Sequence, residues 1–595
     1  MKTALRWCLL VVTFVVTGQG ATAGELPERP NIVFILADDL GYSDLASYGS
    51  EISTPNITAL ANQGIRFTNY HTAANCAPAR AMLLTGVSNH KAGVGNIPET
   101  VHVEARGHVS YKGVLGRNVV TVATLLQDSG YHTYLSGKWH LGQTPDLLPF
   151  RRGFERTVAL ADSGADNWQQ RPYMPLYKKA SWYADGEEFT LPEDFYSSRY
   201  LVDRMIEFIG GNADDDQPFF AFLSFQAVHI PVQAPQEFID HYKGVYDQGW
   251  AALRTARLKG AIEKGIVPAD TKMAPMSSTE DWDAQSAAEK RYQAKRMAVY
   301  AAMVEAMDHN IGRLIDHLKS TGEFDNTIFI FTSDNGTHSS GRHNQKDLIS
   351  RFTNGQMNYS SDYETLGLKG SYNALSRSFA SASSSPLSLY KFYTGEGGMR
   401  VPLIISGANL PNQNKLSSAF SFATDITPTI LSLTGVRAPT GRYAGRPIEP
   451  MIGRDLMPVV TGIADDVYGE NDPVGYELAG HKALFMGDHK IVKIRTPMGD
   501  GSWHLYDIVR DPGETTDLSA QIPIRFQTML NHYHTWAVEN GVIEVPDSYN
   551  YMRQIILNSM QKRLSKGLVI FLLTLLILAP FVVAWRLKKR GSGSS

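Results

Sequence analysis

The stretch "NCAPARAMLLTG" at positions 75–86 brings a thiol close to a guanidinium, because Arg80 follows Cys76 by four residues. Pro78 falls in the first turn of a predicted short helix, a position that proline favours. The N-terminus of that helix would point at Cys76, and Arg80, one turn further on, would lie on the same side. A helix N-terminus beside an arginine is suited to binding an oxyanion.

A second set of residues offers only oxygen ligands. Asp38 and Asp39 end the apolar run "NIVFILADD", and Asp334 and Asn335 follow the run "NTIFIFTS". Carboxylate and amide oxygens suit a hard cation such as Ca²⁺ or Mg²⁺. Either pair alone is also typical of a solvated strand end. Carboxylates from two strands that meet in one cleft, however, need a cation to offset their repulsion.

Two further apolar runs end in basic side chains. "YHTYLSGKWHLG" contains Lys138 and His140, and "PFFAFLSFQAVH" ends at His229. None of the four runs alternates cleanly, which is typical of strands buried on both faces, and helical stretches separate them. This order predicts an α/β fold with a large, mostly parallel sheet flanked by helices. Because ligands bind at the carboxyl ends of the strands in such sheets, we expect the polar residues of all four runs to meet in one cleft.

These motifs resemble those of the type I sulfatases. "CAPAR" matches the Cys-x-Pro/Ala-x-Arg signature of that family, and "GYHTYLSGKWHLG", "FTSDNG" and "YDIVRDPGETTDLS" extend the similarity over most of the chain. The segment "SPLSLYKFYTGEGGMRVP" is most similar to bacterial arylsulfatases, in which a lysine at the position of Lys391 reaches the substrate. The resemblance implies an alkaline-phosphatase-like fold. It also implies hydrolysis of sulfate esters, aryl sulfates in particular, to an alcohol or phenol and inorganic sulfate.

The resemblance further implies a modified residue and a metal. Cys76 would be oxidised after translation to formylglycine by a formylglycine-generating enzyme. The hydrated aldehyde of formylglycine would be the nucleophile, and a covalent sulfo-enzyme would form. The metal, Ca²⁺ with Mg²⁺ as the alternative, would be held by Asp38, Asp39, Asp334 and Asn335.

Five basic residues receive roles from the same resemblance. Arg80 and Lys138 would hold the sulfate, the arginine through its forked donors. His229 and Lys391 would protonate the departing alcohol or phenol. His140 would take the proton whose removal expels sulfate and restores the aldehyde. A sulfated small molecule is the implied substrate.

Both ends of the chain carry targeting patterns. Residues 1–23 hold two basic residues, a short apolar run and the small-residue site "ATA", which predict a cleaved signal peptide. Cys8 would leave with that peptide, so Cys76 would be the only cysteine of the exported chain. Residues 567–585 carry no charge and would span roughly 28 Å as a helix, which predicts a transmembrane helix in a lipid bilayer. The basic cluster that follows predicts a cytoplasmic tail over 586–595. The catalytic domain would then face the periplasm or the cell exterior.

Between these ends we expect three regions. A catalytic domain would cover residues 24–440, a smaller α+β subdomain 441–545 and a stalk 546–566. In the subdomain, "GDHKIVKIR" and "WHLYDIV" predict strands, and a helix is predicted from about residue 524 to 538. Residues 244–290 are predicted to be an insertion over the cleft, with no assigned role.

Three other functions are compatible with these motifs, and one class of function is not. A net charge of −3 gives no electrostatic reason to expect nucleic-acid binding. The first alternative is a phosphonate monoester or phosphodiester hydrolase, which shares the formylglycine signature. The second is a carbohydrate sulfatase, which uses the same site. The third is a membrane-tethered binding protein with an inert site, which predicts an unmodified thiol at Cys76.

Overall fold

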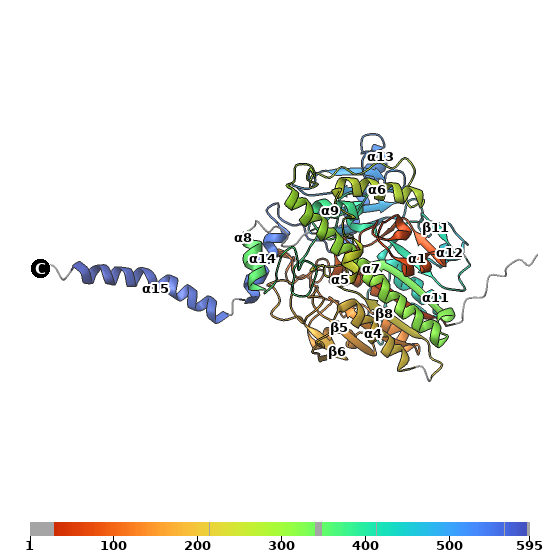
Figure 1. Ribbon diagram of the computed structural model, residues 1–595, viewed down its shortest axis with the longest axis horizontal. Helices are drawn as coiled ribbons and strands as arrows, with labels where there is room; N and C mark the ends of the chain where they lie inside the picture. The colour runs from red at the N-terminus through yellow and green to blue at the C-terminus, as the bar shows by residue number, and fades with distance from the viewer. Residues whose placement is uncertain (1–28, 213–214, 340–347, 412, 564–565, 592–595) are drawn as a thin grey trace, which may run out of the picture.

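The computed structural model describes residues 29–212, 215–339, 348–411, 413–563 and 566–591 (Figure 1). A ten-stranded sheet forms its centre, in the order β11-β2-β10-β9-β1-β8-β4-β5-β6-β7. Its middle strands are β9 (Thr327–Ser333), β1 (Asn31–Ala37), β8 (Phe219–Ser224), β4 (His132–Lys138) and β5 (Arg156–Leu160), all parallel to one another. The first four are the four predicted apolar runs, which are therefore confirmed as adjacent strands.

The outer strands correct the prediction of a mostly parallel sheet, because the sheet is mixed. β10 (Leu403–Ser406) runs antiparallel to both of its neighbours, β9 and β2 (Gly64–Phe67). At the other edge, β6 (Trp182–Ala184) and β7 (Glu187–Glu188) add an antiparallel meander, while β11 (Lys415–Ser417) is parallel to β2. These strands have two to four residues, too few to show a hydrophobic period in the sequence.

Helices cover both faces of the sheet, and the side chains of β1 show how each face is filled. Val33 and Ile35 pack with α1 (Pro55–Asn62), α4 (Ser197–Gly210) and α7 (Ala287–Thr321). Ile32 and Phe34 point the other way and pack with α2 (Cys76–Thr85), α3 (Val122–Asp128) and α11 (Ile426–Leu433). Burial on both faces explains why the central strands are continuously apolar.

The predicted insertion at residues 244–290 contains α6 (Gly249–Glu263), which packs on α9 (Arg377–Ser383). The buried Arg257 fixes α6 to the body through ion pairs with Asp44 and Glu51. The shorter elements are α5 (Gln236–His241), α8 (Leu348–Gln356), α10 (Glu396–Met399), α12 (Met457–Thr461), β3 (Tyr70–His71), β12 (Ser421–Phe422), β13 (Arg442–Tyr443) and β14 (Arg446–Pro447).

A second, antiparallel sheet lies in the C-terminal part of the chain. It has the order β15 (Val474–Leu478), β16 (His481–Met486), β17 (His489–Lys493), β18 (Trp503–Asp507), and α13 (Pro523–Glu539) packs on it. The predicted strands in "GDHKIVKIR" and "WHLYDIV" and the predicted helix are present; β15 and β16 were not predicted. Tyr476 and Phe485 join the core of the large sheet, while Leu484 and Ile491 face α13. The boundaries at 440 and 545 stay predictions.

Two helices end the described chain. α14 (Tyr551–Arg563) lies against the body within the predicted stalk, and α15 (Lys566–Gly591) extends away from it (Figure 1). α15 covers the predicted transmembrane segment. Among the helices as far as they are described, none combines the length and apolar character required to cross a bilayer, so this prediction is not confirmed. The predicted signal peptide lies outside the described residues.

Candidate active site

The carboxyl ends of the central strands meet at one buried group of charges. Lys138 Nζ donates to Asp38 Oδ2 at 2.6 Å, and Lys391 Nζ donates to Asp39 Oδ1 at 2.6 Å. Arg80 Nε donates to Asp334 Oδ2 at 2.9 Å. Each of the three carboxylates therefore contacts a basic side chain from a different segment. All predicted site residues are buried, and the contacts below bring them together.

Cys76 lies at the start of α2, against both acidic loops. The Asn75 side chain accepts a hydrogen bond from the Cys76 amide at 2.8 Å and caps the helix. Cys76 Sγ lies 3.0 Å from Lys391 Nζ, 3.6 Å from Asp38 Oδ1 and 3.8 Å from Asp39 Oδ1. Burial raises the pKa of the Cys76 thiol far above its ordinary value, so the sulfur is uncharged. Since the thiolate is the reactive form of cysteine, unmodified Cys76 is a poor nucleophile.

The Arg80 guanidinium is held from several sides. Its Nε donates to Asp334, as described above. In addition, its Nη1 donates to the Lys138 carbonyl oxygen at 2.8 Å and to Ser224 Oγ at 2.6 Å. Arg80 thus links the ends of β4, β8 and β9. Its fixed planar fork explains why an arginine stands here rather than a second lysine.

The three carboxylates differ in their proton affinity. Burial and the neighbouring Asp334 raise the pKa of Asp38 to about 7, although Lys138 opposes this rise. Burial would also raise the pKa of Asp39, but Lys391, His229 and His338 together outweigh burial and hold that pKa well below its usual range. In the same way Arg80, Lys138 and Lys391 together outweigh burial and lower the pKa of Asp334. Asp38 is therefore the carboxylate of the three that takes up a proton most readily, whereas Asp39 and Asp334 stay ionised.

The donors present fit a divalent cation. Ligand atoms of Asp38, Asp39, Cys76 and His229 all lie within 4.8 Å of one another. Asp39 Oδ2 and Asn335 Oδ1 are buried oxygens that make no hydrogen bond in the described structure. Asp334 Oδ1 accepts from the Asp39 amide at 3.2 Å, and Asn335 Nδ2 donates to Asp39 Oδ1 at 2.7 Å. Asp334 and Asn335 thus adjoin this group, while their role as ligands stays a prediction.

The two histidines are oriented differently. His229 Nδ1 lies 2.7 Å from the Ile230 carbonyl oxygen, which leaves Nε2 directed toward Asp39 Oδ2 at 3.7 Å. His140 Nε2 lies 3.5 Å from Glu99 Oε2. Burial lowers the pKa of His229 and of His140, so the neutral form of each ring is favoured at neutral pH.

Several site residues have a left-handed backbone. Asp39 has φ 64°, His140 has φ 56°, and Leu389 and Phe392, which flank Lys391, have φ 61° and 77°. Non-glycine residues rarely adopt this region, and strained positions of this kind cluster at functional sites. The strain is carried at the turns that aim the Asp39, His140 and Lys391 side chains into the group.

Buried charges from the C-terminal sheet hold the segment that carries Lys391. Lys490 Nζ, from β17, donates to Glu396 Oε1 and to Glu514 Oε1, each at 2.8 Å. Glu514 in turn accepts from the Glu396 amide at 2.9 Å and from the Ser388 hydroxyl. The C-terminal sheet therefore helps to build the site, which the sequence did not indicate.

Sequence reasoning missed three side chains next to the catalytic candidates. Ser224 ends β8 and binds Arg80; its place at a strand end was a usable signal. His338 follows Asn335 by three residues, and its ring lies 5.7 Å from that of His229. Glu99, which faces His140, lies in a loop with no pattern that points to it.

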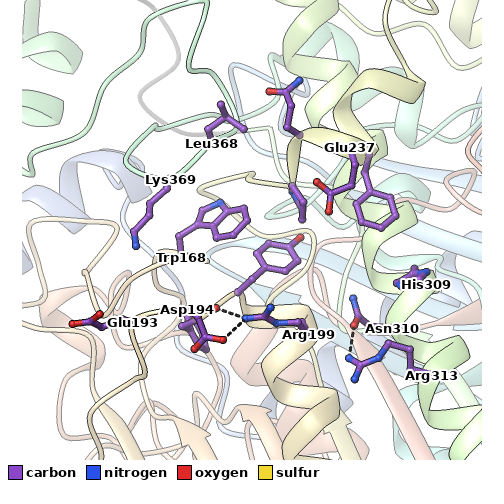
Figure 2. A pocket seen from close by; sticks show the side chains of 15 residues that line it. Trp168, Glu193, Asp194, Arg199, Glu237, His309, Asn310, Arg313, Leu368 and Lys369 are labelled. Atoms are coloured by element: carbon purple, nitrogen blue, oxygen red, sulfur yellow. Dashed lines mark hydrogen bonds and ion pairs between the residues drawn. The ribbon is translucent and has the colours of Figure 1, made fainter.

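A separate surface hollow of about 780 Å³ lies between α4, α5 and α7 (Figure 2). Trp168, Tyr196 and Phe238 give it an aromatic wall, and Arg199 is paired there with Asp194. None of the predicted site residues lines it. This hollow is thus distinct from the group of reacting side chains.

Fold and site together define a hydrolase of the alkaline-phosphatase-like class, with a buried group of carboxylates at the strand ends whose donors fit a cation. Residues 30–436 match the family model named Sulfatase. An uncharacterized sulfatase of Schizosaccharomyces pombe is 37% identical over 543 residues, covering 88% of this chain and 96% of that protein. The arylsulfatase of Klebsiella aerogenes is 36% identical over 451 residues, covering 75% and 95%. The chain belongs to the formylglycine-type sulfatase family and is a sulfuric ester hydrolase.

Solved structures share this fold at lower identity. Ps i-CgsB in complex with k-i-k-neocarrahexaose has a TM-score of 0.62 at 23% identity, covering 91% of this chain and 98% of that chain. The phosphonate monoester hydrolase of Agrobacterium radiobacter has a TM-score of 0.52 at 18% identity, covering 86% and 95%. The fold therefore carries more than one kind of ester hydrolysis, and the substrate has to be argued from the site.

Proposed function

We propose that this sulfatase hydrolyses aryl sulfate esters, with formylglycine made from Cys76 as its reactive group. The observation that carries the proposal is the position of Cys76 Sγ, 3.0 Å from Lys391 Nζ and 3.6 Å from Asp38 Oδ1. The uncharged thiol is unsuited to attack, whereas the hydrated aldehyde of formylglycine supplies a hydroxyl nucleophile at the same place. Similarity to the arylsulfatase of Klebsiella aerogenes favours an aryl alcohol as leaving group.

The buried carboxylates would hold the cation. Ca²⁺ fits best because the predicted ligands Asp38, Asp39, Asp334 and Asn335 offer only oxygen, with Mg²⁺ as the alternative. When bound, the cation supplies a positive charge that lowers the pKa of a coordinated hydroxyl and attracts a sulfate oxygen.

The chain's own basic groups would bind and orient the sulfate. Lys391 Nζ lies 3.0 Å from Cys76 Sγ, and Lys138 and Lys391 place two ammonium groups each at 2.6 Å from a carboxylate oxygen of the group. Arg80 keeps Asp334 and the ends of β4 and β8 in register. Donors fixed before the reaction stabilise the charge that develops on the sulfate oxygens without a cost of reorganisation.

Lys391, His229 and His140 are the residues that would transfer protons. Lys391 Nζ would hold the proton for the leaving oxygen, and His229 Nε2 would share this role only in the imidazolium form, because Nδ1 carries the proton of the neutral ring; Asp39 orients both groups. His140, neutral because burial lowers its pKa, would accept a proton at Nδ1, because Nε2 faces the Glu99 carboxylate at 3.5 Å and carries the proton of the neutral ring. The carboxylate of Glu99 then stabilises the resulting imidazolium.

Export and membrane anchorage complete the proposal. The signal-peptide pattern of residues 1–23 supports export to the periplasm or cell exterior. Apolar side chains of α15 are exposed all around the helix; they include Leu568, Ile570, Phe571, Leu572, Leu573, Leu576, Ile577, Leu578, Phe581 and Val582. A helix that is apolar on every side suits lipid better than water, which supports a membrane anchor over residues 567–585.

Mass spectrometry of the tryptic peptide covering residues 67–80 tests the reactive group. Exchange of the thiol for an aldehyde lowers the peptide mass by about 18 Da. An intact thiol in the exported protein, together with absent turnover, would reject catalysis and favour the binding-protein alternative.

Matched substrates test the ester class. We expect an aryl sulfate to be hydrolysed faster than the corresponding aryl phosphate, phosphonate monoester and sulfated sugar. The aryl phosphate and the phosphonate monoester are included because a phosphonate monoester hydrolase shares this fold. Faster turnover of the aryl phosphate or the phosphonate monoester would identify the protein as a phosphodiester or phosphonate monoester hydrolase. Faster turnover of the sulfated sugar would identify it as a carbohydrate sulfatase.

A further inference from the structure

α14 turns two polar side chains, Gln554 and Asn558, and one aromatic side chain, Tyr551, toward the protein. Gln554 and Asn558 are buried, and Asn558 Nδ2 donates to the Glu99 carbonyl oxygen at 2.8 Å. On the outer side, Met552, Ile556 and Met560 follow one another at intervals of four residues, with exposed fractions of 46%, 58% and 54%. These positions lie along one face of the helix.

Apolar side chains thus lie on the exposed side of α14, where an ordinary surface helix carries polar ones. Leu557 adds a 48% exposed side chain to the outer side. The loop beneath α14 is fixed to it by Arg106, which donates to Gln561 and Asn558, and the same loop exposes Val103 and Val109. A row of exposed apolar side chains on a well-packed helix indicates a partner that covers it.

The sequence of the neighbouring segment indicates which partner this is. Only two residues separate α14 from α15, and the apolar side chains of α15 are exposed on all sides. A helix directly before a membrane anchor is held at the bilayer surface by its connection. Arg553, exposed on α14, adds a basic group of the kind that interfacial helices direct to anionic headgroups.

We propose that the outer face of α14, formed by Met552, Ile556, Leu557 and Met560, lies in the headgroup region of a lipid bilayer. This inference rests on the membrane anchorage proposed above. The same helix borders the reacting residues, since Tyr551 stacks on Phe392 at 4.7 Å and Phe392 follows Lys391. Asn558 holds the backbone of Glu99, whose carboxylate faces His140. The bilayer contact therefore adjoins the active site.

Fluorescence of the full chain in vesicles tests the contact. An environment-sensitive probe is attached to the variant Ile556→Cys, which also carries Cys8→Ser in case the signal peptide is retained, and the protein is reconstituted in phosphatidylcholine and phosphatidylglycerol vesicles; Cys76 is buried and does not compete for the label. The matched control is Ile524→Cys on α13, a helix that lies away from α15 (Figure 1); this isoleucine is 84% exposed. We expect a blue-shifted emission at position 556 and severalfold stronger quenching by a lipid-bound quencher than at position 524.

A second labelled position and an activity assay distinguish the possible outcomes of this experiment. Met560→Cys repeats the measurement in case the first variant is poorly folded. Equal quenching at positions 556 and 524 would overturn the proposal, and so would probe self-quenching that rises with protein-to-lipid ratio, because it indicates a second copy on this face. Turnover of a soluble aryl sulfate in the same vesicles tests the sulfatase function independently. A chain that fails to enter vesicles yet turns over substrate rejects the anchorage and the contact, but not the enzyme.

Discussion

At the scale of single residues, the site is a balance of buried opposite charges. Asp38, Asp39 and Asp334 each accept a hydrogen bond from a basic side chain, and none of these groups is exposed. Burying charges is costly unless they are paired, so this much charge in one place has to be maintained by function. Removing one partner should therefore affect activity more than an equal change at the surface.

Lys138→Met removes the ammonium group that donates to Asp38 and keeps a side chain of similar length. We expect kcat on an aryl sulfate to fall roughly 100-fold or more, because a fixed donor to the transition state is lost. The control is Lys179→Met, which breaks the exposed ion pair with Glu188 and should leave kcat unchanged. Equal effects of the two substitutions would contradict the assigned role.

Asp308 gives a pH-dependent prediction outside the site. Its carboxylate on α7 accepts from the amides of Asn56 at 3.1 Å and Ile57 at 2.8 Å, at the start of α1. Burial raises the pKa of Asp308 from 3.8 to about 6, although these hydrogen bonds oppose it. Because the folded-state pKa exceeds the unfolded value, its stabilising contribution is complete below about pH 4 and is lost as the pH rises through 6.

Comparison with Asp308→Asn isolates this group. Between pH 4 and 7 the wild-type protein should lose up to about 3 kcal/mol of unfolding free energy relative to the variant, from about 1.4 kcal/mol for each pKa unit. Urea unfolding at several pH values measures the difference. A difference that does not change with pH would show that Asp308 titrates alike in both states.

Among single residues, those predicted correctly as neighbours share a strong local signal. Asp38, Asp39, Asp334 and Asn335 end apolar runs, and Cys76 and Arg80 stand in one short motif. Glu99 and Lys490 had no such signal, because each acts through a partner that is distant in the sequence: His140 for Glu99, Glu396 for Lys490.

At the scale of elements, the site depends on a contact between the two sheets. Lys490, from β17, is fully buried between Glu396 and Glu514, and these glutamates fix the segment that carries Lys391. Glu396 also pairs with His71 on β3 and with Arg400. A small C-terminal sheet thus supports a lysine at the centre of the large domain.

Lys490→Met should therefore lower stability and activity together. Removing one member of a buried ion pair leaves carboxylates uncompensated and costs about 3–5 kcal/mol. We expect a lower Tm by thermal unfolding and a reduced kcat, because the Lys391 segment loses its support. Lys493→Met, at a partly exposed position of the same strand, is the control and should change neither quantity appreciably. A normal kcat in folded Lys490→Met would refute the supporting role.

Elements differ in how well the sequence predicted them. β1, β4, β8 and β9 were found because burial on both faces makes them continuously apolar. The short antiparallel strands at the sheet edges were not, since long-range pairing rather than local pattern defines them. β15 and β16 were missed for a related reason: their two faces pack on different partners, the large core and α13.

At the scale of the whole molecule, the C-terminal helices connect the catalytic body with its proposed anchor. Chain termination after residue 563 removes α15 and keeps α14. We expect this form to remain outside the membrane fraction with an unchanged kcat on a soluble aryl sulfate, because no described site contact comes from α15. Retention in the membrane fraction would place the anchor elsewhere.

Termination after residue 545 removes α14 as well. Tyr549, whose hydroxyl donates to the Thr100 carbonyl oxygen at 2.9 Å, is then lost together with Tyr551 and Asn558. We expect a lower Tm and a reduced kcat/KM, because the Glu99 loop and Phe392 lose their packing partners. Kinetics identical to those of the longer form would show that α14 is dispensable for the site.

The position of Cys76 also sets an order of events during biosynthesis. Its side chain is 1% exposed, at the beginning of a helix enclosed by the large core and the strand ends. The proposed modifying enzyme would need to reach this sulfur, and the folded domain leaves it almost no exposed surface. The proposed conversion of the thiol would therefore have to precede folding, and a chain that folds first would keep an unmodified, uncharged thiol.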